Sequence, residues 1–160
     1  MAAPSFETAD RPASGPVRQI SVFLENRVGQ LLRLLQVLQH GTSVKVRGLS
    51  IVHATDCAIV RLICDDTDAA KRILRDENFA LSESDVLAVE LPDTSALLMV
   101  CAALLSAEIN ISYIYPLFEQ HSGRTVIAIL CDDMTTAAAV LGHRKFRLVS
   151  EDDLGPGPAR

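Results

Sequence analysis

Residues 19–38 read QISVFLENRVGQLLRLLQVL, and they predict a strand, a turn and a helix in that order. Positions 20–24 alternate apolar and other side chains with the period of two that is typical of a strand. From Gly29 to Gln39 the leucines recur at i, i+3, i+4 and i+7, which is the spacing of a helix with one buried face. The turn between the two elements holds Asn26 and Gly29.

The same pattern returns about 67 residues later. An offset of 67 aligns Val22 with Val89 and the tripeptide at 64–66 (CDD) with the one at 131–133, whereas 65 fits better in the middle of the repeat. The first half then has two extra residues near 40–43, and the second half has a hairpin longer by two near 121–123. The matches fall mainly on apolar positions in one order, so the sequence predicts an internal duplication.

Each half reads as β-α-β-β-α-β. The expected strands are 20–24, 44–52, 58–64 and 79–81, then 86–91, 109–118, 125–131 and 146–149; the expected helices are 29–39, 66–74, 95–107 and 135–141. This is the ferredoxin-like plan, an α+β fold with antiparallel sheets. We expect units at 19–85 and 86–154, a disordered tail at 1–18 and a flexible tail at 155–160. A unit of this size can form only a small hydrophobic core, so we expect the two units to share an interface.

Composition excludes several classes of protein. The 160 residues are 49% hydrophobic and carry 15 Lys+Arg against 20 Asp+Glu, a net charge of −5. An acidic chain lacks the excess of Lys and Arg that binding to nucleic-acid phosphates requires, so we do not expect nucleic acid as a partner. The apolar run at 96–105 is about half the length of a membrane span, and residues 1–19 lack the apolar core of a secretory signal. Four cysteines without metal or disulfide spacing fit a cytoplasmic protein.

With these elements in hand, the chain resembles the tandem ACT-domain proteins, small-molecule sensors built from βαββαβ units. The resemblance rests on residues 19–38, 46–66 and 107–133 and covers nearly all of 19–154. The family's first turn is typically Asp/Asn-Arg-Pro-Gly, followed two residues later by Leu. Here residues 26–31 read NRVGQL, with Val in place of Pro, while residues 93–98 read DTSALL and lack the Arg, the Pro and the Gly.

The first turn suits a ligand on physical grounds as well. A glycine lets backbone N–H groups approach a ligand, and the N-terminus of a helix offers unpaired donors to a carboxylate. Asn26 could hold an α-ammonium group, or it could simply cap the helix. The second turn places Ala96 at the glycine position and adds the negative charge of Asp93, so we expect one strong site and a weak or empty second site.

The resemblance implies that an amino acid lies between this turn and the second strand of the neighbouring unit. The strong site would comprise Asn26, Arg27, Val28, Gly29, Gln30 and Leu31 with Ile111, Ser112, Tyr113, Ile114 and Tyr115; the weaker site would comprise Asp93, Thr94, Ser95 and Ala96 with Leu49, Ser50 and Ile51. Tyr113 and Tyr115 alternate with Ile114 and so share one face. They would either contact the ligand or cover the seam between the units.

Other motifs have simpler explanations. In each CDD tripeptide the second aspartate is expected to cap the following helix. The four histidines have no zinc-site spacing, and the sequence lacks a nucleophile elbow and a phosphate loop. Arg27 resembles the arginine of acylphosphatases, but the glycine-rich anion cradle is missing. The third strand of each unit lacks the aromatic residues of an RNA-binding platform.

The helix at 96–107, ALLMVCAALLSA, is apolar nearly all round, so we expect it to pack on another unit or another chain, with Leu98, Cys101, Ala102 and Leu105 mostly inaccessible. Together these features predict a non-enzymatic, cytoplasmic, homodimeric sensor that binds a free amino acid, without cofactor or metal, to regulate a partner. The alternatives are a ligand-free interaction module and, third, an acylphosphatase-type enzyme.

Overall fold

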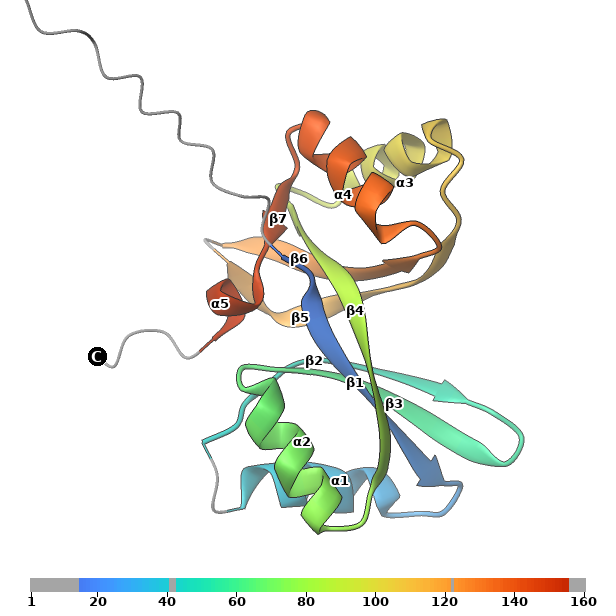
Figure 1. The fold of residues 1–160 in the computed structure, drawn as a ribbon, viewed down its shortest axis with the longest axis vertical. Coiled ribbons are helices and arrows are strands. Elements are labelled where there is room, and N and C mark those ends of the chain that lie inside the picture. The colour runs from blue at the N-terminus through green and yellow to red at the C-terminus, as the bar shows by residue number, and fades with distance from the viewer. Residues whose placement is uncertain (1–14, 41–42, 122, 156–160) are drawn as a thin grey trace, which may run out of the picture.

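A computed structural model describes residues 15–40, 43–121 and 123–155 of the chain. Its elements are β1 (Val17–Glu25), α1 (Gln30–Gln39), β2 (Val46–His53), β3 (Cys57–Cys64), α2 (Thr67–Asp76), β4 (Ala80–Leu91), α3 (Ala96–Ser106), β5 (Ile111–His121), β6 (Arg124–Cys131), α4 (Met134–His143), β7 (Arg147–Val149) and α5 (Glu151–Leu154) (Figure 1). The predicted order of strands and helices is confirmed, and only α5 was not expected.

The predicted tails need one correction. Residues 1–14 and 156–160 lie outside the described residues, but Val17 and Arg18 belong to β1, where Val17 is buried. The expected length differences near 40–43 and 121–123 also fall partly outside the described residues. No helix in the described ranges is both long and apolar enough to cross a bilayer.

Each half of the sheet has the ferredoxin-like strand order. The order is β4-β1-β3-β2 in the first half and β7-β4-β6-β5 in the second, and all the pairs are antiparallel. The two halves even share an irregularity. The register shifts between Val46 and Gly48 in β2, and it shifts again between Ile111 and Tyr113 in β5. An irregularity at equivalent places supports the predicted duplication.

The two halves share an interface, as expected, but they join into one closed sheet and are not two clearly separate units. Strand β4 is continuous through the expected boundary at 85/86: residues 80–86 pair with β1, and residues 87–91 pair with β6. On the other side β2 meets β5 at Gly48 and Leu117, where a Cβ on Gly48 would collide with the Leu117 side chain. The sheet therefore closes through β1-β3-β2-β5-β6-β4 into a six-stranded, barrel-like body, with β7 added beside β4.

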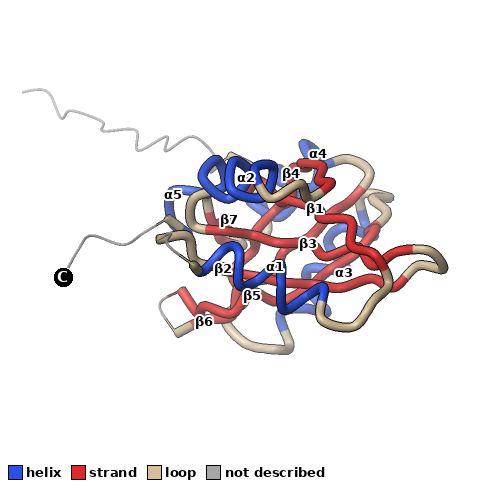
Figure 2. The backbone as a smooth tube through the Cα atoms, turned by 90° about the horizontal axis from the view of Figure 1, so that it is seen from below, coloured by secondary structure: helices blue, strands red, loops and turns tan. Residues whose placement is uncertain are grey.

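Three apolar layers hold this body together. One packs α1 and α2 on the first half of the sheet, and a second packs α3 and α4 on the other half. The two helix pairs lie at opposite ends of the molecule, with the sheet between them (Figure 1), and Figure 2 views the molecule from the end that carries α1 and α2. The third layer fills the space between the facing inner surfaces and includes Ile63, Val86, Ala128 and Leu154. We call this inner space the seam.

Helix α3 is less buried than its sequence predicted. It packs through Ala96, Val100, Ala103 and Leu104, whereas Leu98 and Leu105 are each 76% exposed. Ala102 is also exposed, and Cys101 is half-buried. The expectation that this face is covered is wrong within one chain, because the first half packs on the inner face of the sheet and α3 lies on the outer face.

Candidate ligand-binding site

The first turn has the backbone conformation that its glycine predicted. Gly29 immediately precedes α1 with φ of 87° and ψ of −9°, in the left-handed region that glycine occupies without strain. A Cβ there would meet nothing within 4 Å, so it is the backbone angle that makes this position favour glycine. Val28 is fully exposed beside it. The turn is thus open to solvent.

The N-terminus of α1 is free of side-chain caps. No side chain caps the helix at Gly29, and its first turn holds no acidic residue. Arg27 pairs with Glu25, but both side chains are about 70% exposed, so this pair contributes little. The first backbone N–H groups of a helix lack partners within the helix, so this end can accept an anion.

Asn26 does not cap the helix. Its Nδ2 lies 2.8 Å from Nε2 of His53, at the end of β2. If the amide N–H donates, Nε2 must be unprotonated and the Asn26 Oδ1 is left free to accept. His53 was not among the predicted site residues. Its position could have been inferred from the strand order. Strands β1 and β2 both pair antiparallel with β3, so they run in the same direction and their C-terminal ends lie at the same edge of the sheet.

The second turn is closed by its own aspartate. The Asp93 carboxylate accepts hydrogen bonds from the backbone N–H groups of Ser95 and Ala96, at 2.8 and 3.3 Å, and from the Ser95 hydroxyl. These bonds, that from the Ser95 hydroxyl first, hold the pKa of Asp93 below its usual range. The donors that a ligand carboxylate would need are therefore already occupied.

The residue at the glycine position of this turn also differs from the expectation. Ser95, with φ of −70°, precedes α3, while Ala96 is the first residue of the helix and is buried. Leu24 and Leu91 are equivalent positions, because their cross-strand partners, Ala58 and Thr125, are also 67 residues apart. Counted from these positions to the first helical residue, the second turn is one residue shorter, and this explains the misalignment. Crowding by the Cβ of Ala96 is therefore not what separates the two turns.

Strand β5 presents its residues to two different layers. Ile111 and Ile114 pack in the outer core under α3 and α4. Tyr113 and Tyr115 share the opposite face, as predicted, with ring centroids 6.2 Å apart. Ser112 lies at the register shift and is exposed.

The two tyrosines cover the seam. The Tyr115 hydroxyl donates to Oε1 of Gln19 at 2.7 Å, and Nε2 of Gln19 donates to the Tyr113 hydroxyl at 2.8 Å. Gln19 is completely buried, and burial raises the pKa of Tyr115 above its ordinary value. The sequence left open whether these tyrosines contact a ligand or cover the seam between the units, and in the structure they make hydrogen bonds across the seam.

The two parts of the predicted strong site have different neighbours. Among the described residues, no hydrogen bond or ring contact joins 26–31 to 111–115, and none joins 93–96 to 49–51. Leu49 packs in the first outer core, Ser50 is half-buried and Ile51 is 46% exposed. The ladder between β2 and β5 is a single residue pair, so the strand ends that should flank a ligand are not held together by a ladder.

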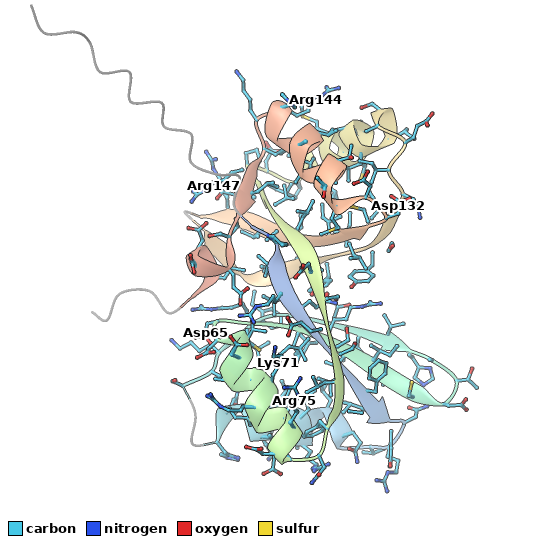
Figure 3. The ribbon with its side chains drawn as sticks, viewed as in Figure 1. Asp65, Lys71, Arg75, Asp132, Arg144 and Arg147 are labelled. Carbon is cyan, nitrogen blue, oxygen red and sulfur yellow. The ribbon has the colours of Figure 1, made fainter. Side chains whose placement is uncertain are left out.

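A groove of about 570 Å³ lies toward the other end of α1. Its lining includes Leu35, Val44, Leu49 and the exposed Phe118. Lys45 is its one charged residue. In Figure 3 the labelled charged side chains come from α2, β7 and the loops beside α2 and α4, such as Lys71 and Arg144. The lining also includes the neutral polar residues Gln39 and Ser43, but it holds no carboxylate to pair with the α-ammonium group of an amino acid.

Comparison with known proteins connects this geometry to a family. The family model described as an ACT domain pair matches residues 16–156. A Bacteroides thetaiotaomicron protein of known structure has a TM-score of 0.80 at 28% identity, over 89% of this chain and 97% of its own. A search of curated proteins found no match.

Two more distant structures share the fold. One is the regulatory subunit of aspartate kinase from Thermus thermophilus in its ligand-free form, with a TM-score of 0.55 at 13% identity, over 79% of this chain and 91% of that one. The other is the corresponding subunit from Thermus flavus, with a TM-score of 0.53 at 16% identity, over 81% and 92%. The match of the family model over most of the chain decides the assignment: this protein belongs to the ACT domain pair family.

Proposed function

We propose that this chain is a non-enzymatic, cytoplasmic regulatory sensor that binds a free amino acid at the turn formed by residues 26–31. The observation that carries the proposal is the contrast between the two turns. The donors at the start of α1 have no side-chain cap, whereas those at the start of α3 are taken by Asp93. Membership of a family of regulatory domains supports the same conclusion.

The residues of this turn complement both charged groups of an amino acid. The backbone N–H groups around Gly29 would bind the carboxylate, helped by the partial positive charge of the helix. The Asn26 Oδ1, left free by the bond to His53, would accept from the α-ammonium group. Binding would thereby also hold the ends of β1 and β2 together. If the ligand also contacts residues 111–115 of the second half, as predicted, binding favours one arrangement of the two halves.

The contribution of residues 111–115 stays a prediction. Tyr113 and Tyr115 are engaged with Gln19, so Ser112 is the polar side chain in this segment that remains exposed. The second turn, with 93–96 and 49–51, would be weak or empty because Asp93 occupies its donors.

We also propose that the chain is a homodimer that pairs through α3. Leu98, Ala102 and Leu105 follow one another at i, i+4 and i+7 on its exposed face. Helix α3 carries no charged residue, so pairing two copies buries no unpaired charge, and Ala102 leaves room for close approach. The regulated partner would be a separate protein. A ligand-free interaction module is the second candidate, because this same surface would serve it.

Thermal unfolding in the presence of each of the twenty amino acids tests the sensor. A ligand at 100 times its Kd should stabilise the wild type by about 2.7 kcal/mol. Gly29→Val should lose most of the response, and Asn26→Ala checks the same site without changing the left-handed residue. Ser95→Val is the matched control at the second turn and should keep the response. No shift with any amino acid at millimolar concentration would favour the interaction module. A shift that is unchanged in both first-turn variants would show that the ligand binds elsewhere and would contradict the proposed site.

A further inference from the structure

A row of polar side chains crosses the inner face of the first half of the sheet. Ser50 of β2 pairs with Arg61 of β3, Arg61 pairs with Ser21 of β1, and Ser21 pairs with Ser82 of β4. Residues directly opposite in antiparallel strands point to the same face. Three hydroxyl groups therefore lie in line with one guanidinium group, on the face that looks away from α1 and α2.

Polar residues are unusual at this position, because an inner face between two sheets is normally apolar. The next row, toward the hairpin, is apolar and consists of Phe23, Ile59 and Val52. Ser21, Ser50 and Arg61 are half-buried, so the row is partly shielded but open to solvent. We call Ser21, Ser50 and Arg61 the seam cluster.

Arg61 is held in place by the other half of the protein. Its guanidinium carbon lies 3.7 Å from the centre of the Tyr113 ring, which is a close cation–π contact. The Tyr113 hydroxyl is in turn fixed by Gln19, which also bonds Ser84 at 3.2 Å. Within the described part of the chain, the guanidinium N–H groups of Arg61 make no hydrogen bond, so they can donate to a ligand.

The charge of the seam cluster is unbalanced. None of its cross-strand neighbours is acidic, and no ion pair to Arg61 occurs within the part of the chain that the structure describes. Among the side chains that the structure describes, the inward-facing acid of the second half is Glu90, and it is paired with Arg124 and Arg147. One cation flanked by neutral hydroxyl donors is therefore available to an anion.

We propose that Arg61, with the hydroxyls of Ser21 and Ser50, binds the carboxylate of a small monocarboxylate in the seam between the two halves. The planar guanidinium fork matches the two oxygens of a carboxylate. A single positive charge balances one carboxylate, whereas a phosphate dianion would bring a second, unpaired negative charge. This site is distinct from the turn at 26–31 and does not depend on the proposed amino-acid site.

The protein supplies its own optical reporter for this site. It has no tryptophan, and its two tyrosines, Tyr113 and Tyr115, both lie in the seam. Tyrosine fluorescence therefore reports on the ring that stacks on Arg61. The probes are formate, acetate and L-lactate as sodium salts, each titrated to roughly 10 mM, about ten times a Kd of 1 mM. Sodium chloride at the same concentration controls for ionic strength.

Three arginine variants make the test specific. Arg61→Gln removes the charge, and Arg61→Lys keeps the charge but removes the fork. Arg33→Gln is the matched control, because Arg33 also stacks on an aromatic ring, that of Phe79 at 4.7 Å, but belongs to α1. We expect a saturable change in the wild type and in Arg33→Gln, and binding weaker by about tenfold or more in Arg61→Gln.

The outcomes separate this site from the turn. Gly29→Val should leave the monocarboxylate response intact; if it abolishes the response while Arg61→Gln does not, the anion binds at α1 and the seam proposal is wrong. Absence of a saturable change in the wild type with all three probes also overturns it. If Arg61→Gln does not fold, Arg61→Lys tests the proposal in its place. An affinity of Arg61→Lys for the monocarboxylates equal to that of the wild type would exclude the bidentate contact.

Discussion

The Tyr115 hydroxyl donates a 2.7 Å hydrogen bond to Oε1 of Gln19, joining residues 96 positions apart in the chain. Gln19 is on β1 and Tyr115 is on β5, so the bond crosses the seam from one half of the protein to the other. The amide group of Gln19 is satisfied at both ends, because its Nε2 donates to Tyr113 and Ser84. A buried glutamine thus fixes how the two inner faces meet.

Replacing Gln19 by Leu should destabilise the protein by about 1–3 kcal/mol, because every hydroxyl group that bonds its amide loses that partner. Urea unfolding measures the change. Gln36→Leu on the exposed face of α1 is the control and should stay within about 0.5 kcal/mol of the wild type. Adding Tyr115→Phe to Gln19→Leu should recover part of the loss; strictly additive losses would show that the pair does not act as a unit.

Gly29→Ala should cost about 1 kcal/mol of stability, because an alanine must adopt a φ of 87° there. The comparison is Ser95→Ala, at a position whose φ of −70° any residue adopts, and we expect little change from it. Thermal or urea unfolding of the two ligand-free variants checks this. Equal costs at both positions would contradict the difference between the turns.

The ion pairs of Arg18 predict a loss of stability in acid. Arg18 donates from Nε to both Glu151 oxygens, at 3.1 and 3.0 Å, and from Nη1 to Asp68 at 2.9 Å. Burial alone would raise the pKa of Glu151, but the bonds from Arg18 outweigh it and hold the pKa below 4.5. A carboxylate with a lowered pKa in the folded state stabilises at neutral pH, and this contribution is lost as pH falls below 4.5.

Glu151→Gln should therefore flatten the fall in unfolding free energy between pH 7 and about pH 3. Urea unfolding across this range gives the slope. Asp152→Asn, an exposed neighbour on the same short helix, is the control and should keep the slope of the wild type. A slope that is the same in all three proteins would remove Glu151 from the acid response.

Leu98→Asp and Leu105→Asp should convert the proposed dimer into a monomer, because each places a charge on the exposed apolar face of α3. Light scattering gives the mass in solution. Leu32→Asp is the control, since Leu32 is also exposed, at 61%, but belongs to α1. A wild type that is monomeric at all concentrations would contradict pairing through α3.

Much of the local structure could be predicted from spacing alone. The periods of two and 3.6 located the strands and helices, and Asp66 and Asp133 do cap α2 and α4, through bonds to the backbone N–H groups of Ala69 and Thr136. The need for glycine at position 29 also followed from the strand–helix junction. These features depend on residues within a few positions of one another, so the sequence determined them.

The tertiary structure decided which faces of the strands and helices contact each other. Tyr113 and Tyr115 share a face because Ile114 separates them, but only the closure of the sheet through Gly48 and Leu117 brings that face to Gln19. In the sequence Arg61 is one polar residue in an apolar strand, and Asp93 is merely a negative charge in a turn.

The seam cluster, the closed second turn and the continuous β4 all depend on pairings between residues far apart in the chain or on the exact length of a turn. Periodicity places a side chain on a face of its own element, and it carries no information about which face of another element covers it. The helices, strands and first turn of this protein were therefore determined by its sequence alone, and the seam between its halves by the fold.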